Sequence, residues 1–350
     1  MTFHLRPTQF VDTPVTHPDG GVARLAGGML WFAAYEVIKG SRRSTVPVAE
    51  IANLGPGAAA IHARITAPRA ALTIGERTLR FDQPMVAGIL NVTPDSFSDG
   101  GTLQDDPEAA AAAGVAMAAA GAAMIDVGGE STRPGAALVW EGDEAKRVSP
   151  VIERLLRAGT LVSVDTRKGA VMEAALALGP VIVNDVSALL WDERAAGIVA
   201  RANAPVILMH SPDPKRGPHG GDGYANVLTE VYDWLEVRIE AVVAAGIDRA
   251  KVIIDPGIGF GKSLADNLAL INGLALFHGL GCPVMLGVSR KRLIGALSGE
   301  APVAERLGGS IALAVKGAEA GVQILRVHDV AETVQAVRVW RGLRDRALVG

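Results

Sequence analysis

Carboxylate, amide and basic side chains recur in this chain directly after short apolar runs. Asp126 follows "AMI", Asp165 follows "LVSV", and Asp255 follows "KVII". A buried carboxylate is costly unless it is paired or hydrogen-bonded, so carboxylates repeated at equivalent positions predict a shared site that meets a polar ligand. The residues at such positions are Asn91, Asp126, Asp165, Asn184, Asp185, Met209, His210, Asp255, Ser289, Arg290, Lys291, Arg326 and His328.

The chemistry of these side chains indicates what kind of ligand they would bind. Carboxylate and amide oxygens accept hydrogen bonds, which suits a ligand rich in N–H donors. Basic side chains suit an anion, most naturally a phosphate. The basic residues of this kind are Arg133, Lys291, Arg326 and His328.

Some of these residues also have simpler explanations. Asp165 and Asp185 could each cap a following helix, and Arg290 could form a surface ion pair. Such explanations suffice for one residue but not for the whole series. The stretch "GIGFGKS", 257–263, superficially resembles a phosphate-binding loop, but Pro256 stands where such a loop needs glycine. We therefore interpret its glycines as places where the backbone approaches a ligand or a neighbouring loop.

Eight short apolar runs precede the polar residues, and helix-like stretches alternate with them. Runs that are apolar throughout predict strands covered on both faces, and the alternation predicts a parallel sheet. Eight such units over about 260 residues predict a (β/α)8 TIM barrel, with an open doubly wound sheet as the alternative. In a barrel the carboxyl ends of all strands meet on one face, where the active sites of this fold lie. The expected strands end near Asn91, Gly128, Asp165, Asp185, His210, Asp255, Ser289 and His328, and the expected helices include 170–178, 224–245, 264–277, 303–320 and 329–343.

Composition narrows the class of protein. Of the 350 residues, 49% are hydrophobic and only 4% aromatic, so a large core must be built mainly from aliphatic side chains. A formal net charge of -3 predicts neither a nucleic-acid partner nor a membrane-surface partner. The apolar stretch 109–125 is rich in Ala and Gly, and we interpret it as a helix over 108–120 and a strand over 124–127 rather than a membrane span. A cytoplasmic location is the default expectation, and the single Cys282 is expected to be a buried thiol.

Residues 1–70 lack the strand–helix alternation and carry no recognisable motif. We expect "GGMLWFAAYEVI" to form a strand and "VPVAEIANL" a short helix, within an accessory layer of unknown role. Residues 71–84 alternate in the manner of a hairpin that turns at Gly75 and Glu76. We therefore divide the chain into an N-terminal extension, 1–70, and a barrel, 71–350, whose N-terminal end the hairpin covers.

Two longer segments identify a family. "GILNVTPDSFSDGG" at 88–101 and "IDVGGESTRPGA" at 125–136 resemble the two signature segments of dihydropteroate synthases. "SVDTRK", "VNDVSA", "LMH", "DPGIGFGK", "GVSRKRLIG" and "RVHDV" follow in that family's order, so the resemblance covers roughly 71–346. It implies a barrel enzyme of folate synthesis that joins 6-hydroxymethyl-7,8-dihydropterin diphosphate to 4-aminobenzoate and releases diphosphate with the help of Mg²⁺. It also implies a homodimer.

The resemblance implies a role for each residue of the series. Lys291, Asp255 and Asp165 would be catalytic, and Asn91 would bind Mg²⁺ through an oxygen of the hard type that this ion prefers. Diphosphate would leave first and the amine would capture the resulting pterin cation, so the site must stabilise charge and exclude water. The pterin would contact Asp126, Asp165, Asn184, Met209, Asp255 and Lys291; the diphosphate would contact Thr132, Arg326 and His328; and the aminobenzoate would contact Phe97, Arg133, Pro134, Phe260 and Ser289.

The chain departs from the family's pattern in two places. Residues 1–70 have no counterpart in the family's minimal form. The segment 211–227 is long and rich in Gly, Pro and His, and its His219 is expected to be solvated rather than a ligand.

Two related functions remain as alternatives. A corrinoid-linked pterin methyltransferase would share the Asp and Asn pocket, but it would need neither Phe97 nor the 289–291 segment. A non-catalytic pterin-binding relative should have lost Asn91, Arg326 and His328, all of which are present.

Overall fold

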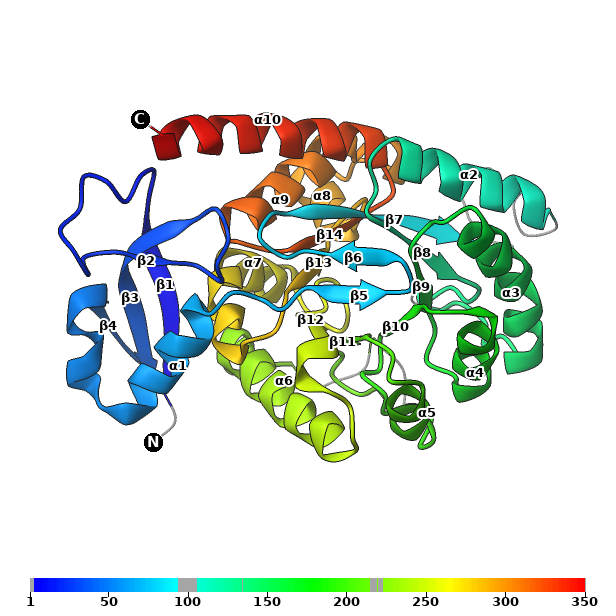
Figure 1. Cartoon of the computed structure of the whole chain (residues 1–350), viewed down its shortest axis with the longest axis horizontal. Helices are drawn as coiled ribbons and strands as arrows, with labels where there is room; N and C mark the ends of the chain where they lie inside the picture. Colours follow the sequence, from blue (N-terminus) through cyan, green and yellow to red (C-terminus); the bar gives the residue numbers. More distant parts are fainter. Residues whose placement is uncertain (1–2, 94–105, 134, 215–218, 220–222, 350) are drawn as a thin grey trace.

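The computed structural model describes residues 3–93, 106–133, 135–214, 219 and 223–349. Eight parallel strands form one sheet in the order β12-β11-β10-β9-β8-β7-β14-β13 (Figure 1). A bridge between Ile254 and Val284 joins the two ends of this order, so the sheet closes into the predicted barrel and the open-sheet alternative is wrong. The strands are β7 (Met85–Asn91), β8 (Met124–Gly128), β9 (Val162–Asp165), β10 (Ile182–Asp185), β11 (Val206–Met209), β12 (Val252–Asp255), β13 (Met285–Gly287) and β14 (Ile324–Val327).

The register of the strands brings their polar ends together. Asn91 at the end of β7 pairs with Gly128 on β8, and Gly128 pairs with Asp165 on β9. Asp165 in turn lies opposite Asn184 on β10. Because these pairings are all at the carboxyl ends of parallel strands, the predicted site residues share one mouth of the barrel.

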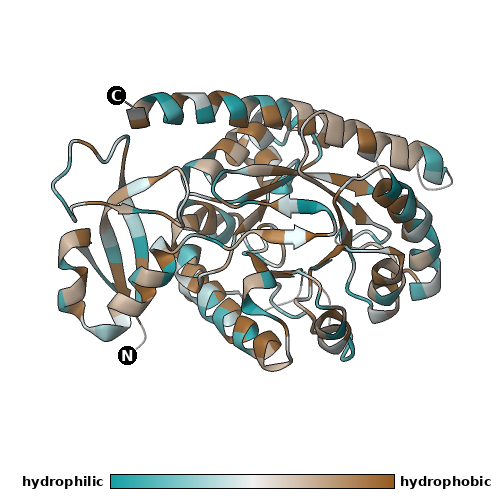
Figure 2. Ribbon diagram, in the orientation of Figure 1, coloured by the Kyte–Doolittle hydropathy of each residue, from teal (hydrophilic) through white to brown (hydrophobic). Residues whose placement is uncertain are grey.

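The helices surround the sheet and differ from the prediction at two places. Gly273 ends the expected helix 264–277 early, and a short 3-10 helix follows, η3 (Leu274–Leu280). The expected helix 303–320 divides into a 3-10 turn, η4 (Val303–Glu305), and α9 (Leu307–Glu319). Figure 2 shows hydrophilic and hydrophobic colours mixed along α3 and α6, as helices with one face on a core require. The other helices are α2 (Pro107–Ala119), α3 (Glu141–Arg157), α4 (Gly169–Leu178), α5 (Ala195–Ala202), α6 (Val227–Ala244), η2 (Arg249–Lys251), α7 (Leu264–Asn272), α8 (Arg292–Leu297) and α10 (Val330–Val349).

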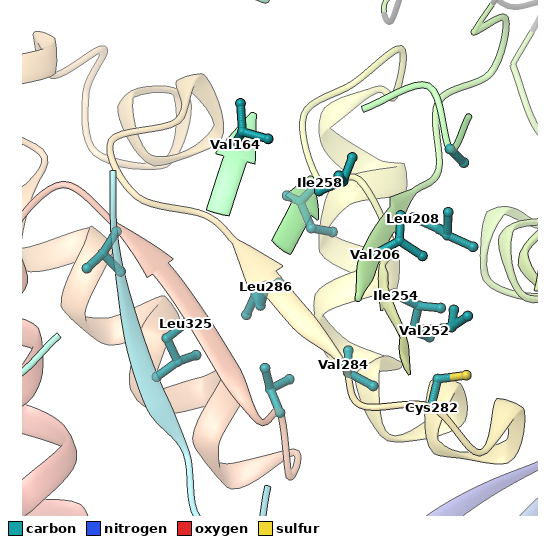
Figure 3. Close-up of a cluster of buried hydrophobic side chains, with 14 of the residues drawn as sticks. Val164, Val206, Leu208, Val252, Ile254, Ile258, Cys282, Val284, Leu286 and Leu325 are labelled. Atoms are coloured by element: carbon teal, nitrogen blue, oxygen red, sulfur yellow. The ribbon is translucent and has the colours of Figure 1, made fainter. Parts of the chain in front are cut away.

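The hairpin and the core follow the prediction. β5 (Leu72–Ile74) and β6 (Arg77–Leu79) pair as a hairpin, and their apolar side chains share a core cluster with the first residues of the barrel strands. The hairpin therefore closes the N-terminal end of the barrel. Cys282 is a buried free thiol in the larger aliphatic core, near Val284 (Figure 3).

The N-terminal extension folds as a small layer beside the barrel (Figure 1, left). Its antiparallel sheet has the order β1-β3-β2, with β4 paired to β3. Its core includes Ala318 of α9 and Trp340 of α10, and its Asp12 pairs with Arg344 of α10 at 2.8 Å. The layer therefore packs on the outer helices of the barrel. Its elements are β1 (His4–Val11), β2 (Ala23–Arg24), β3 (Trp31–Lys39), β4 (Arg42–Pro47), η1 (Val48–Leu54) and α1 (Pro56–Thr66).

The apolar stretch 109–125 divides as predicted into α2 and β8, with Gly121 between them in a left-handed conformation at φ 113°. Across the described part of the chain, no helix has both the length and the apolar character needed to span a membrane.

Candidate active site

Asp126 is the centre of a hydrogen-bond network inside the barrel mouth. Its side chain lies on β8, almost fully buried, and accepts from Ser163 Oγ at 2.5 Å and from Asn184 Nδ2 at 3.0 Å. Arg326 on β14 donates to it through Nε, also at 2.5 Å. A buried carboxylate is costly unless such partners hydrogen-bond it. The network thus fixes the side chains of four strands relative to one another.

The Arg326 guanidinium joins two of the carboxylates. While Nε donates to Asp126, a terminal nitrogen donates to Asp165 Oδ2 at 2.7 Å. Burial alone would lower the pKa of Arg326, but the two carboxylates outweigh burial and raise that pKa. The sequence predicts a diphosphate contact for Arg326. The structure places Arg326 against the predicted pterin carboxylates, and the diphosphate contact stays a prediction.

Asp165 and Asp255 are carboxylates in surroundings that disfavour their charge. Burial raises the pKa of Asp165, against the opposing effect of Arg326. Burial also raises the pKa of Asp255, against the opposing effect of Lys291, and Asp255 Oδ1 accepts the Gly257 N–H at 2.7 Å. Carboxyl groups with raised pKa values in a cleft are typical of functional sites. Both can meet N–H donors of a ligand.

Lys291 reaches across a glycine-rich turn toward the same mouth. Its ammonium donates to the carbonyl of Ile258 and lies 4.5 Å from the centre of the Phe260 ring. The stem passes close to Gly259, where an added Cβ would lie 3.0 Å from Lys291 Cδ. Burial lowers the pKa of Lys291 to about 8, against the opposing effect of Asp255. The group is therefore cationic at neutral pH and close to its titration point.

His328 and Ser289 form a second polar pair at the mouth. Ser289 Oγ lies 3.0 Å from His328 Nδ1 and accepts the His328 backbone N–H at 3.2 Å. Burial, aided by the nearby Arg326 charge, lowers the pKa of His328 to about 3. His328 is thus a neutral imidazole, which can donate a hydrogen bond to an anion but adds no charge.

Asn91 ends β7, half-buried, at the edge of this mouth. A Cβ added at Gly128 would lie 3.7 Å from both Asn91 Oδ1 and Asp165 Oδ2, so these two oxygens lie on either side of Gly128. Oxygen donors are the ligands that Mg²⁺ prefers, and this ion usually keeps several waters. The donor set fits the predicted ion. Within the described ranges, no cluster of three or more His, Cys, Asp or Glu side chains could hold a metal.

The structure describes some of the remaining predicted site residues but not others. Thr132 and Arg133 lie on the loop after β8, with Thr132 half-buried and Arg133 exposed. Met209 ends β11 and is buried. Phe97 and Pro134 lie outside the described residues, so their predicted contacts with aminobenzoate stay predictions.

The glycine-rich turn 257–261 is shaped by Lys262, a residue whose role the sequence did not reveal. Lys262 Nζ donates to the carbonyls of Gly257 and Phe260, at 2.8 and 3.1 Å, and to His210 Nδ1 at 3.0 Å. A Cβ at Gly257 would lie 1.9 Å from the His210 carbonyl oxygen. The turn therefore approaches a neighbouring loop, as predicted, and Lys262 does not act as a phosphate-loop lysine.

His219 was expected to be solvated, and the structure contradicts this. Its ring stacks on Phe260, with centroids 5.3 Å apart and an angle of 12° between the planes. Its Nε2 donates to the Thr132 carbonyl at 2.8 Å. His219 thus links two loops that carry predicted substrate residues. A lone histidine in a long loop gave no periodic signal from which this could be foreseen.

The helix-cap explanation is wrong for Asp165 and Asp185, because α4 and α5 begin after Lys168 and Arg194, neither of which makes a side-chain cap bond. Asp185 accepts from the backbone of Ser187 and Leu189, at 2.6 and 2.9 Å, and so holds the loop after β10. Burial raises its pKa to about 6. Arg290 forms a two-point ion pair with Asp329, with Nε 3.0 Å from Oδ2. The expected ion pair of Arg290 is therefore present, but it is partly buried rather than on the surface.

The chain is similar to known proteins in both sequence and structure. The sequence profile of the family described as "Pterin binding enzyme" matches residues 87–328, which is more than half of the chain. The chain is 43% identical over 274 residues to the dihydropteroate synthase of Neisseria meningitidis serogroup B, covering 77% of this chain and 96% of that protein.

Solved structures agree with the sequence matches. The dihydropteroate synthase of Xanthomonas albilineans with 4-aminobenzoic acid is 47% identical, with a TM-score of 0.72, and the match covers 78% of this chain and 98% of that one. The same enzyme in complex with 7,8-dihydropteroate is matched at 45% identity, with a TM-score of 0.70, over 79% and 99% of the two chains.

Proposed function

The chain belongs to the pterin-binding enzyme family, and from this membership we infer that it catalyses the dihydropteroate synthase reaction of folate biosynthesis. Its substrates are the small molecules (7,8-dihydropterin-6-yl)methyl diphosphate and 4-aminobenzoate. Its products are 7,8-dihydropteroate and diphosphate. The enzyme is a transferase that moves an alkyl group other than methyl.

One observation carries this proposal. Asp126, Asn184, Arg326 and Asp165 form a connected hydrogen-bond network at the mouth, and the nearby charge of Lys291 favours the ionised form of Asp255. Acceptor oxygens in this arrangement suit the donor-rich edge of a pterin, because each ring N–H can meet an oxygen held rigidly by other residues.

The order of bond changes explains which side chains are needed. The bond from the pterin methylene carbon to the diphosphate oxygen breaks first, and its electron pair leaves with the diphosphate. The amine nitrogen of aminobenzoate then bonds to the methylene cation and loses a proton. The weak nucleophile needs no strong base in this sequence, so the protein's task is to stabilise charge and exclude water. Lys291 and Arg326 supply positive charge, and neutral His328 supplies a hydrogen-bond donor.

We propose Mg²⁺ as the cofactor, with Asn91 holding it. When bound, the ion would neutralise charge on the departing diphosphate. The hard oxygen of Asn91 at the mouth supports this assignment. Thr132, half-buried on the loop after β8, is also proposed to contact the diphosphate.

We also propose that the protein is a cytoplasmic homodimer, on the basis of its family resemblance. The N-terminal layer packs on η3, α9 and α10, so a second copy would have to use another part of the surface or pack around this layer. Analytical ultracentrifugation of the full chain tests this, and a single monomeric species at micromolar concentration would contradict it.

The proposed reaction is tested with purified full-length protein, dihydropterin diphosphate, Mg²⁺ and labelled 4-aminobenzoate. Labelled dihydropteroate is the expected product. A corrinoid-linked methyltransferase would form none, and would instead need a methyl donor. A non-catalytic relative would bind the pterin without forming product. Either of these outcomes would refute the synthase assignment.

A further inference from the structure

Lys168 is a buried cation whose contacts are complete within the protein. Its Nζ donates to Glu130 Oε1 at 3.0 Å, to the Val139 carbonyl at 2.6 Å and to Glu144 Oε2 at 2.6 Å. The side chain of Glu144 is fully buried, and those of Lys168 and Glu130 are 9% and 5% exposed. An ammonium has three N–H donors, and all three are used. A charge group of this kind is costly to bury, which points to a specific task.

Two of the three partners of Lys168 lie at the two ends of one loop, and the third, Glu144, lies in α3. Glu130 begins the 130–139 loop after β8, and Val139 ends it. Glu130 Oε1 also accepts the Val139 N–H at 3.0 Å. The N–H and C=O of Val139 are therefore both tied to the Glu130–Lys168 pair. Fixing the base of a loop removes many of the conformations that the loop could otherwise adopt.

This loop carries two predicted substrate residues. Thr132 and Arg133 follow Glu130 directly in the sequence. A fixed base therefore restricts where both of them can lie.

The Glu130–Lys168 pair is also connected to the pterin pocket through the backbone. Lys168 follows Asp165 by three residues, in the turn between β9 and α4. Arg167 in the same turn donates to Glu130 Oε2 at 3.1 Å, and its guanidinium lies 4.0 Å from the centre of the Trp191 ring. This short turn thus begins with Asp165, a carboxylate of the mouth. It ends with Lys168, which binds the base of the 130–139 loop.

We propose that Lys168 is a positioning residue that holds the 130–139 loop at the distance from the pterin pocket that the second substrate requires. This proposal rests on the proposed synthase function. Lys168 does not touch the reacting atoms. It acts through Glu130 and Val139 on Thr132, the proposed diphosphate contact, and on Arg133, the proposed aminobenzoate contact. It therefore governs the use of aminobenzoate and the placing of the diphosphate rather than the binding of the pterin ring.

The test is Lys168→Met, which keeps much of the stem and removes the donors. We expect kcat/KM for aminobenzoate to fall about 10- to 100-fold, because small displacements of positioning groups have effects of this size. The Kd of 6-hydroxymethyl-7,8-dihydropterin, which lacks the diphosphate, should stay within about two-fold when measured in the absence of aminobenzoate. Hydrogen exchange at the Val139 amide should become faster, since its acceptor is no longer held. Lys168→Arg should restore part of the loss, because Arg keeps the charge and the donors.

Two further variants keep the test decisive. Lys168→Met leaves two buried carboxylates near each other, so Lys168→Met combined with Glu144→Gln removes one of those charges if the single variant does not fold. Lys316→Met, an exposed lysine on α9, is the matched control and should match wild type.

The outcomes separate this proposal from the general function. A folded variant whose aminobenzoate kinetics and Val139 exchange equal those of wild type would overturn the positioning role. So would a pterin Kd that weakens in step with kcat/KM. If wild-type protein itself makes no dihydropteroate, the proposed function fails instead, whereas the Val139 exchange still tests whether Lys168 holds the loop.

Discussion

Arg326 and Asp126 are 200 positions apart in the sequence, yet Nε of the first lies 2.5 Å from Oδ2 of the second. The pair exists because β14 lies next to β7, and β7 next to β8, in the closed barrel. Asp165, which accepts from the same guanidinium, is on the next strand. The pairing of β14, the last barrel strand in the sequence, with β7, the first, is therefore what creates the charged wall of the mouth.

Replacing Asp126, which accepts from Arg326 at the centre of this wall, tests how much the hydrogen-bond network contributes. Asp126→Asn leaves Arg326 with one carboxylate and removes the charged acceptor of Asn184. We expect pterin binding at least about 10-fold weaker and the free energy of unfolding lower by about 3 kcal/mol, as for other buried pairs that lose a partner. Titration of the pterin substrate and urea unfolding measure the two effects. Asp345→Asn, exposed on α10, is the control, and equal pterin affinity in both variants would contradict the network's role.

The lowered pKa of Lys291 predicts a pH dependence. The group is charged below a pKa of about 8 and loses its charge as the pH rises through that value. Because Lys291 is proposed to supply positive charge in the mouth, kcat/KM should fall above that pH. Lys291→Arg should be less active but should lack this alkaline limb, because Arg stays charged. A limb at the same pH in Lys291→Arg would show that another group titrates there.

His219 offers a test of the long loop that departs from the family pattern. Removing its ring in His219→Ala loses the stack on Phe260 and the hydrogen bond to Thr132. Aromatic pairs contribute about 0.5–1.5 kcal/mol, so the KM for aminobenzoate should rise about 3- to 10-fold. Steady-state kinetics measure this, with His17→Ala in the N-terminal layer as control. An unchanged KM would show that the contacts of His219 with Phe260 and Thr132 do not affect the binding of aminobenzoate.

The N-terminal layer is predicted to matter for stability and not for chemistry. Trp340 is 8% exposed and joins α10 to the core of the layer. Trp340→Ala should lower the free energy of unfolding by about 3 kcal/mol or more, with the KM of both substrates nearly unchanged. Val339→Ala, at an exposed neighbour, should change stability by less than about 0.5 kcal/mol. A change in KM without a loss of stability would assign the layer a role at the site.

The parts of this structure that follow local rules could be predicted from the sequence. Strands buried on both faces are continuously apolar, so each barrel strand could be found, and its last residue marked the mouth. The hairpin at 72–79 was visible from alternation and from Gly75. The roles of the site residues came from family resemblance, and they remain predictions until variants are measured.

The parts that depend on tertiary contacts could not be predicted. Nothing near Lys168 in the sequence shows that its three acceptors include Glu144 and the Val139 carbonyl. The contacts of His219 likewise depend on how two distant loops approach each other. Gly273 ends a helix that apolar periodicity alone would have continued. In each case side-chain packing between elements decides the outcome, and a one-dimensional pattern does not record it.

The central claim is that this barrel mouth forms dihydropteroate from its two substrates. The most direct measurement counts products in one reaction of the wild-type protein with dihydropterin diphosphate, 4-aminobenzoate and Mg²⁺. The account predicts one diphosphate released for each dihydropteroate formed, with both lost together in Asp255→Asn. Diphosphate released without dihydropteroate, or no release at all from folded wild-type protein, would contradict it.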